Sequence, residues 1–203
     1  MTASLEQQTR RLLYHLRKQM NGDALDRMLC YGEPYARNYG VQIYALRDVA
    51  REVGCNHSLA EHLREQNVRE LRIIAVWIAD VEVLDSATIA PWLNAITNSE
   101  LAEQTAHALL SRYEGLAQLL CDDAVLREPF VAYALLLAAS RCAVADMEVV
   151  QHALAALDYH PNNALVARAA VAWLSVLDNP HALLEQLPDT PTARLVREEM
   201  SWR

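Results

Sequence analysis

Glycine, proline and phenylalanine are scarce in this chain, whose 203 residues include 5 Gly, 7 Pro and 1 Phe. So few Gly and Pro residues leave little room for disorder. No run of about 18 apolar residues occurs, and the start, MTASLEQQTRRLL, lacks a signal-peptide core, so neither a membrane span nor secretion is expected. With 53% hydrophobic residues, we expect one ordered cytoplasmic domain over residues 1–203.

Cysteine and histidine are too widely spaced for a metal site. The four cysteines form no C-x-x-C pair and have no zinc-type spacing with the histidines: Cys30, Cys55, Cys121 and Cys142. His57 and His62 are five residues apart, which places them on different faces of a helix. We therefore expect buried thiols in a reducing compartment, no metal and no cofactor.

Positive charge is in deficit overall, since the formal net charge is −8. On its own this charge argues against a nucleic-acid binder, because phosphate contacts need a local excess of Lys and Arg. The charge is nevertheless uneven. Residues 1–72 hold 11 of the 18 basic and 9 of the 26 acidic residues, a balance of +2, whereas the remainder has a balance of −10. The sequence therefore predicts a polarised molecule.

Helix signals run through the whole chain. Ser4, Ser58 and Asn67 each precede a Glu or Gln by three residues, the spacing of a capping box. Apolar residues then recur at intervals of three and four, as in Leu71, Ile74, Ala75 and Ile78, and no segment alternates strictly enough to predict a strand. The sequence predicts an all-α protein.

The predicted helices come in pairs, and the second members of successive pairs begin alike. Their starts lie at Asn67, Asn98, Arg127 and Asn162, separated by 31, 29 and 35 residues. Such a period with two helices per unit is typical of an α-solenoid of HEAT or armadillo type, built from antiparallel helix pairs. The alternative is an irregular helical bundle with accidental spacing. In a solenoid the second helices line a concave groove.

Three stretches carry a resemblance to a known family: NYGVQIYALRDVARE (38–52), SLAEHLREQNVRELRIIAVWIAD (58–80) and APWLNAITNSELAEQ (90–104). They resemble the HEAT-like repeat DNA alkylation repair proteins, which include the alkylpurine DNA glycosylases. The resemblance covers most of the chain and is weak after residue 125. It implies the solenoid fold and a role on DNA.

The resemblance also implies catalytic positions, several of which are occupied by other residues. Glycosylases of the family use a Trp followed four positions later by an Asp, and Ser99 and Glu103 stand at the matching positions. Glutamate keeps the charge, whereas serine lacks the aromatic face that cradles the nucleotide. An expected Arg falls near Ala132 or Tyr133, and an expected aromatic falls beside Trp173. Ser99 and Glu103 also fit an ordinary exposed helix turn, and Trp173 also fits the core.

Five arginines are candidate contacts to DNA: Arg47, Arg51, Arg69, Arg72 and Arg168. Arg47 and Arg51 are one helical turn apart, a spacing suited to adjacent phosphates. The alternative is local pairing with the interleaved acids Asp48, Glu52, Glu65 and Glu70. The stretch CYGEPYARNYG (30–40) is either a further contact loop or a connector packed on the first repeats.

Two functions follow from these patterns. The first is a divergent DNA alkylation repair-like protein that binds duplex or damaged DNA in its groove, with the glycosylase residues largely replaced and base excision left open. The alternative is a non-enzymatic HEAT-like scaffold that binds a basic protein or peptide, to which the −10 balance of residues 73–203 points. No membrane partner is expected.

Overall fold

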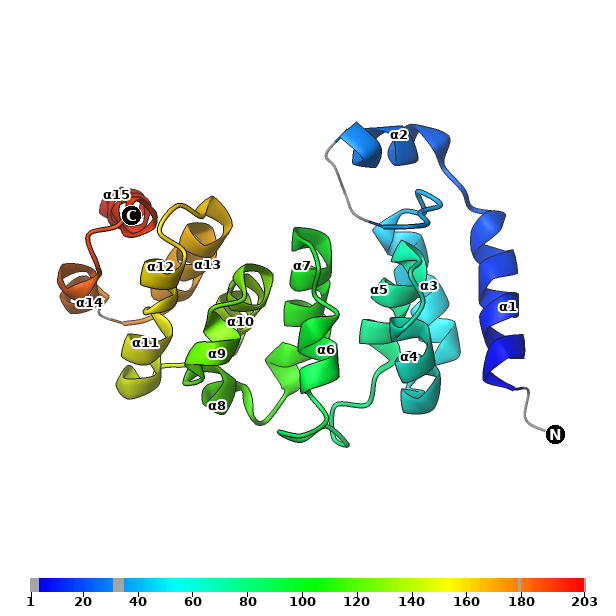
Figure 1. Ribbon diagram of the computed structural model, residues 1–203, viewed down its shortest axis with the longest axis horizontal. Coiled ribbons are helices and arrows are strands. Elements are labelled where there is room, and N and C mark those ends of the chain that lie inside the picture. Colours follow the sequence, from blue (N-terminus) through cyan, green and yellow to red (C-terminus); the bar gives the residue numbers. More distant parts are fainter. Residues whose placement is uncertain (1–3, 31–34, 179, 203) are drawn as a thin grey trace. The chain divides into compact units, whose positions relative to one another are not determined.

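The computed structural model describes residues 4–30, 35–178 and 180–202, with the side chains of residues 29 and 30 left out. The regular elements of these residues are helices, which are joined by turns and loops (Figure 1). In chain order the helices are α1 (Leu5–Arg17), α2 (Gly22–Cys30), α3 (Ile43–Val53), α4 (His57–Arg64), α5 (Arg69–Ile78), α6 (Ala90–Asn94), α7 (Ser99–Ala108), the 3-10 helix η1 (Leu110–Arg112), α8 (Leu116–Leu120), α9 (Asp123–Leu126), α10 (Pro129–Cys142), α11 (Met147–Ala153), α12 (Ala156–Tyr159), α13 (Ala164–Leu174), α14 (His181–Gln186) and α15 (Pro191–Ser201). No strand is found among them, so the all-α prediction is confirmed for the described residues.

Two compact units divide the chain, and α7 crosses the boundary between them. The N-terminal unit is Met1–Gln104 and the C-terminal unit is Thr105–Arg203. The expectation of one domain over residues 1–203 stays a prediction, and each unit is described by itself.

Side-chain caps explain where the helices of the N-terminal unit begin. Ser4 forms the expected capping box with Gln7 at the start of α1. At α4 the predicted cap was wrong by two residues, because Asn56, and not Ser58, accepts from the Leu59 amide. Asn67 does not cap α5 either. An isolated parallel bridge joins Arg37 to the residue after Asn67, which holds that segment extended up to α5.

Two rows of helices build the N-terminal unit. The first row is α1 and α4, which pack on each other, and the second is α3 and α5, which do the same; α4 and α5 join the rows (Figure 1). The apolar stripe predicted from residue 71 onward lies in the core between them, since Leu71, Ile74 and Ala75 are all 0% exposed. This arrangement of paired helices is the one that the spacing predicts.

The C-terminal unit repeats the arrangement. Its long helices α10, α13 and α15 pack in sequence, while the shorter α8 packs on α11. Helices α5, α7, α10 and α13 begin within two residues of the starts predicted for the second members. The cap of α13 is Asn163, one residue after the predicted start at Asn162, and it accepts from the amides of Leu165 and Val166.

The cysteines correct one expectation. Cys55, Cys121 and Cys142 are exposed free thiols, not buried ones, and the side chain of Cys30 lies outside the described residues. No group of three or more His, Cys, Asp or Glu side chains that could hold a metal occurs in the described parts of the chain. Among the same residues, no helix has the length and apolarity needed to cross a bilayer.

Candidate nucleic-acid interface

The start of α7 is held by buried polar contacts. Asn98 is 3% exposed, and its Oδ1 accepts from the Leu101 amide at 2.8 Å, which caps the helix. The Tyr35 hydroxyl donates to Asn98 Oδ1 at 3.3 Å and to Glu100 Oε2 at 3.1 Å. Ser99 is the half-buried first residue of α7, and Glu103 is exposed one turn later. The two positions singled out by the resemblance therefore lie on a firmly anchored helix end.

Arg69 provides the anchor. Its side chain is 1% exposed, and it donates from Nε to Glu100 Oε2 at 2.8 Å and from Nη2 to Glu100 Oε1 at 2.6 Å. Such a bidentate pair fixes geometry as well as charge. Because the guanidinium is buried and occupied, the prediction that Arg69 contacts DNA is corrected: this residue joins α5 to α7.

Glu70 completes the buried network. Its Oε1 accepts from Arg69 Nη1 at 3.2 Å and from the amides of Tyr39 at 3.0 Å and Val41 at 3.3 Å. Burial opposes the charge on Arg69, but the hydrogen bonds and charges of the two glutamates outweigh it and raise the pKa of Arg69. Burial, together with the Glu100 charge, raises the pKa of Tyr35. The network is thus a structural connection between consecutive repeats.

The second row, formed by α3 and α5, carries arginines that remain at the surface. Arg47 on α3 is exposed, and its guanidinium carbon lies 5.6 Å from the ring centroid of Trp77 on α5. Among the described residues Arg47 forms no ion pair with a carboxylate. Arg51, one turn on, pairs with Asp48 at 3.2 Å, but both side chains are mostly exposed. Exposed pairs of this kind contribute little, so a phosphate can compete for Arg51.

The remaining predicted contacts divide into two groups. Arg72 is half-buried, and its Nε donates to the Gln66 carbonyl at 3.1 Å; Arg168 is exposed on α13. Trp173, in contrast, is 0% exposed, and its indole N–H donates to the Val144 carbonyl at 2.9 Å. Trp173 therefore offers no ring face at the surface, and the core alternative holds. Ala132 and Tyr133, beside the expected arginine position, are buried as well.

Part of the tyrosine-rich stretch 30–40 also packs inward. The Ala36 amide donates to Asn67 Oδ1 at 3.4 Å, and the Arg37 carbonyl accepts from the Arg69 amide at 3.0 Å. Residues 35–40 are therefore a connector against α5, which is the second of the two alternatives. Residues 31–34 of that stretch lie outside the described residues.

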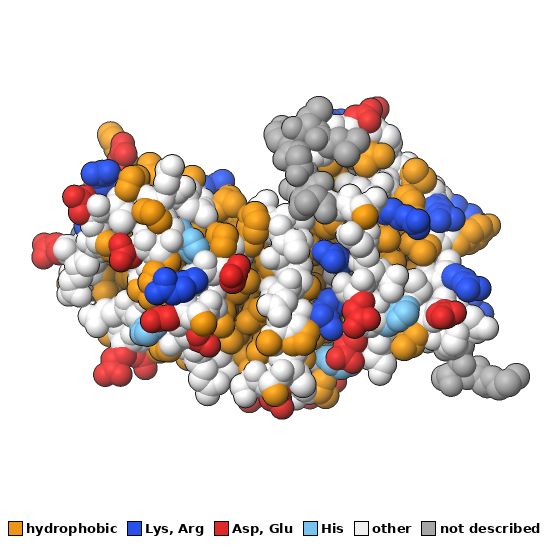
Figure 2. Space-filling view, viewed as in Figure 1, with side chains coloured by type: hydrophobic (Ala, Val, Ile, Leu, Met, Phe, Trp, Pro, Cys, Tyr) orange, Lys and Arg blue, Asp and Glu red, His pale blue; other side chains and the backbone are white. Residues whose placement is uncertain are grey.

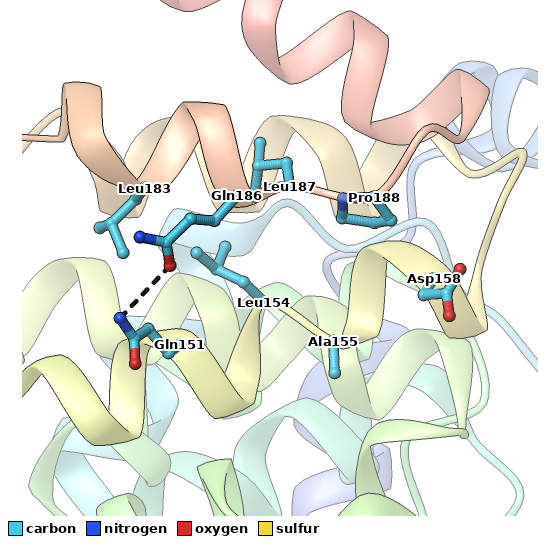
Figure 3. Close-up of a pocket in the computed structure, with 8 residues that line it drawn as sticks. All are labelled: Gln151, Leu154, Ala155, Asp158, Leu183, Gln186, Leu187 and Pro188. Carbon is cyan, nitrogen blue, oxygen red and sulfur yellow. Dashed lines mark hydrogen bonds between the residues drawn. The ribbon is translucent and has the colours of Figure 1, made fainter.

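A separate pocket of about 280 Å³ lies in the C-terminal unit, between α11, α12 and α14 (Figure 3). Leu154, Leu183 and Leu187 form its apolar wall, and the side chains of Gln151 and Gln186 are hydrogen-bonded at 3.4 Å. The exposed carboxylate of Asp158 belongs to the same lining. This pocket combines an apolar interior with a negative charge.

Comparison with known families now bears on this geometry. The model of a family described as "DNA alkylation repair enzyme" matches residues 12–173. The chain belongs to this family. The family match spans α3, α5 and α7, which carry the network and the surface arginines, and it extends to Trp173. No curated protein matches the chain.

One solved structure is similar over almost the whole chain. It has 12% sequence identity and a TM-score of 0.70, and the match covers 95% of this chain and 93% of the other. That structure is described as "a new family of proteins related to the HEAT-like repeat DNA glycosylases with affinity for branched DNA structures". At this identity the likeness concerns the fold, and it confirms the HEAT-like repeat of helix pairs predicted from the spacing.

Sequence reasoning missed two features of this DNA alkylation repair family member. Arg69 and Glu100 are 31 residues apart, which is the first repeat spacing, so they stand at equivalent positions of adjacent helix pairs. Opposite charges at equivalent positions of adjacent repeats could therefore have predicted this ion pair from the sequence. Trp77, which lies beside Arg47, carries no comparable signal, because a Trp at helical spacing more often belongs to the core.

Proposed function

We propose that this protein binds DNA through the surface of α3 and α5 and that it does so without excising bases. The observation that carries the proposal is the pair of exposed arginines on α3, Arg47 beside Trp77 and Arg51 one turn away, with the half-buried Arg72 on α5. Arginines placed one turn apart suit successive phosphates. Membership of the DNA alkylation repair family and the branched-DNA affinity reported for the similar structure support the same ligand.

Several residues argue against excision. In the resemblance, the catalytic pair is an aromatic residue and an acid four positions later, where this chain has Ser99 and Glu103. Stacking a base on an aromatic ring is worth about 1–3 kcal/mol, which serine cannot supply. The positions beside the expected arginine are buried apolar or aromatic side chains. In this proposal Glu103 is therefore a surface acid near the DNA, not a general catalyst.

The test is fluorescence-anisotropy binding of a blunt duplex, the same duplex with an abasic-site analogue, and a four-way junction, each over a series of salt concentrations. We expect a clear salt slope in the wild-type protein. Arg47→Ala with Arg51→Ala should reduce that slope by roughly 2, since each phosphate contact contributes about 0.9. The matched control is Arg112→Ala with Arg141→Ala, which removes the same charge from two exposed positions of the C-terminal unit.

Absence of binding at low salt would refute the proposal. An equal reduction of the salt slope in the control variant Arg112→Ala with Arg141→Ala would also refute it, because the lower net charge alone would then explain the effect. Excision is tested separately by base release from alkylated duplex. Release that is lost in Glu103→Gln would overturn the non-catalytic part of the proposal and leave the DNA-binding part standing.

The pocket of the C-terminal unit favours a second candidate function, the binding of a basic protein segment. Residues 105–203 contain 7 basic and 12 acidic residues, so the C-terminal unit has a net negative charge that attracts cationic partners. A pocket of about 280 Å³ is at the lower limit for small ligands and accommodates one apolar side chain. Peptides pairing Leu or Trp with Lys should bind, and Asp158→Asn should weaken them; equal binding of Glu-containing peptides would contradict this alternative.

A further inference from the structure

The N-terminal helix α1 presents a second cationic surface, distinct from α3 and α5. At about 100° per residue, Arg10, Arg11, Tyr14 and Lys18 fall within an arc of about 100°. All four side chains are exposed. We call these four residues the α1 basic face. Lys and Arg side chains are prominent over α1 in Figure 2.

The opposite side of α1 is committed to the fold. Thr9 and Leu16 are buried there, and α1 packs on α4, the other helix of the first row. The apolar side of this amphipathic helix is therefore not available to a bilayer, which is what a surface-lying membrane helix requires. The α1 basic face lies on the solvent side, and half of it precedes the segment matched by the family, which begins at residue 12.

Carboxylates neutralise this face only weakly. Glu6 approaches Arg10 at 3.7 Å, but both side chains are at least 75% exposed. Such pairs yield readily to a polyanion. Arg11 and Lys18 form no ion pair with a carboxylate among the described residues. Instead, Lys18 Nζ lies 4.3 Å from the ring centroid of Tyr14.

Tyr14 determines which kind of nucleic acid fits. Its side chain is 65% exposed at the middle of the face, with cations on both sides along the helix. An exposed ring among cations is the combination that binds single strands, because unpaired bases stack on the ring while the cations hold the backbone. A paired duplex keeps its bases stacked internally and offers no base face to Tyr14. From Arg10 to Lys18 the face extends about 12 Å along the helix axis.

We propose that the α1 basic face binds an unpaired strand, such as the single-stranded arm of a branched DNA, while α3 and α5 hold the duplex. This inference rests on the proposed DNA-binding function and adds a second contact to it. Arg10, Arg11 and Lys18 contact the phosphates of the arm, and Tyr14 stacks on one of its bases. The protein then prefers DNA that carries both a duplex and an unpaired segment.

The experiment compares a blunt duplex with the same duplex carrying a single-stranded oligothymidine arm. Wild-type protein should bind the armed duplex more tightly. Arg11→Gln with Lys18→Gln should abolish that preference and leave blunt-duplex affinity within about 2-fold. Tyr14→Ala should weaken armed-duplex binding by about 5-fold or more, the lower end expected for losing one stacked base, whereas Tyr14→Phe should retain it. Far-UV circular dichroism checks that each variant is folded.

The failure of this inference is distinguishable from failure of the proposed function. If no DNA binds, both fall. If the duplex binds through Arg47 and Arg51 but the α1 variants keep the preference for the arm, the inference alone is overturned. It is also overturned if Arg112→Gln with Arg141→Gln removes the preference equally. The α1 variants are also tested on anionic phosphatidylserine vesicles. If Arg11→Gln with Lys18→Gln loses vesicle binding but binds the armed duplex as the wild type does, the face binds lipid and the inference is overturned.

Discussion

Replacing Arg69 by methionine tests whether the buried ion pair is what holds α7 on α5. Methionine keeps much of the aliphatic volume but removes the guanidinium from between Glu70, which is 0% exposed, and Glu100, which is 20% exposed at its side chain. Breaking a buried ion pair on one side typically costs about 3–5 kcal/mol, since the remaining charge is left uncompensated. We expect the free energy of unfolding of Arg69→Met to fall by about that amount.

The loss should follow from the stranded charge, not from lost volume. In Arg69→Met with Glu70→Gln the buried negative charge is gone, while the amide oxygen still accepts from the backbone amides of Tyr39 and Val41. This double variant should therefore be more stable than Arg69→Met alone. Arg141→Met, at an exposed position, is the control and should change stability by less than about 0.5 kcal/mol.

Urea unfolding followed by far-UV circular dichroism measures all three variants. For a chain of this size, a loss of 3–5 kcal/mol corresponds to roughly 6–20 °C in Tm, which thermal scans check independently. A cost below about 1 kcal/mol for Arg69→Met would refute the anchoring role. If the double variant were less stable than the single one, the stranded-charge explanation would be refuted even though the anchor remained.

Three further outcomes are expected. Burial and the nearby carboxylate of Glu100 raise the pKa of Tyr35, so the folded state keeps a proton that the unfolded state loses above about pH 10. The free energy of unfolding should therefore fall as the pH rises through that range. In urea titrations at alkaline pH, Tyr35→Phe should make this fall less steep. Cys142 is exposed as a residue, but partial desolvation of its thiol raises the pKa, so in single-cysteine variants Cys142 should react more slowly with a thiol reagent than Cys55, and equal rates would contradict this. Trp173→Ala should destabilise the protein by about 3–5 kcal/mol, measured by urea unfolding, whereas Trp202→Ala, 84% exposed, should change stability by less than about 0.5 kcal/mol.

Helix content and pairing were predictable because they depend on periodic patterns that the packing preserves. The recurrence of apolar residues placed the core, as Leu71 and Ile74 show. Caps were less predictable, since a tertiary contact can replace a local one. Asn67 has the right spacing for a capping box, but the bridge from Arg37 extends the chain there, and Asn67 accepts from the Ala36 amide instead.

The site was harder to predict, because the role of a charged residue depends on its neighbour in the next repeat. Arg47 and Arg69 look alike in sequence, since each is followed directly by an acid, Asp48 and Glu70. One is at the surface and the other is fully buried. Residue type and local spacing alone do not separate these two cases.

The repeat spacing does separate them. Adding 31 residues to Arg69 leads to Glu100, with which it pairs. Arg47 lies on α3, which begins 26 residues before α5, so its equivalent position is Ile73, which is buried and offers no charge. In a repeat of this kind, a cation with an acid at the equivalent position of the next repeat is positioned to join repeats, and a cation without one is available to a ligand. Arg72 has Glu103 at the equivalent position. By this argument Arg72 contributes less to DNA binding than Arg47, so Arg72→Ala should reduce the salt slope by less than Arg47→Ala does, and an equal reduction would show that the repeat spacing does not govern which arginines reach DNA.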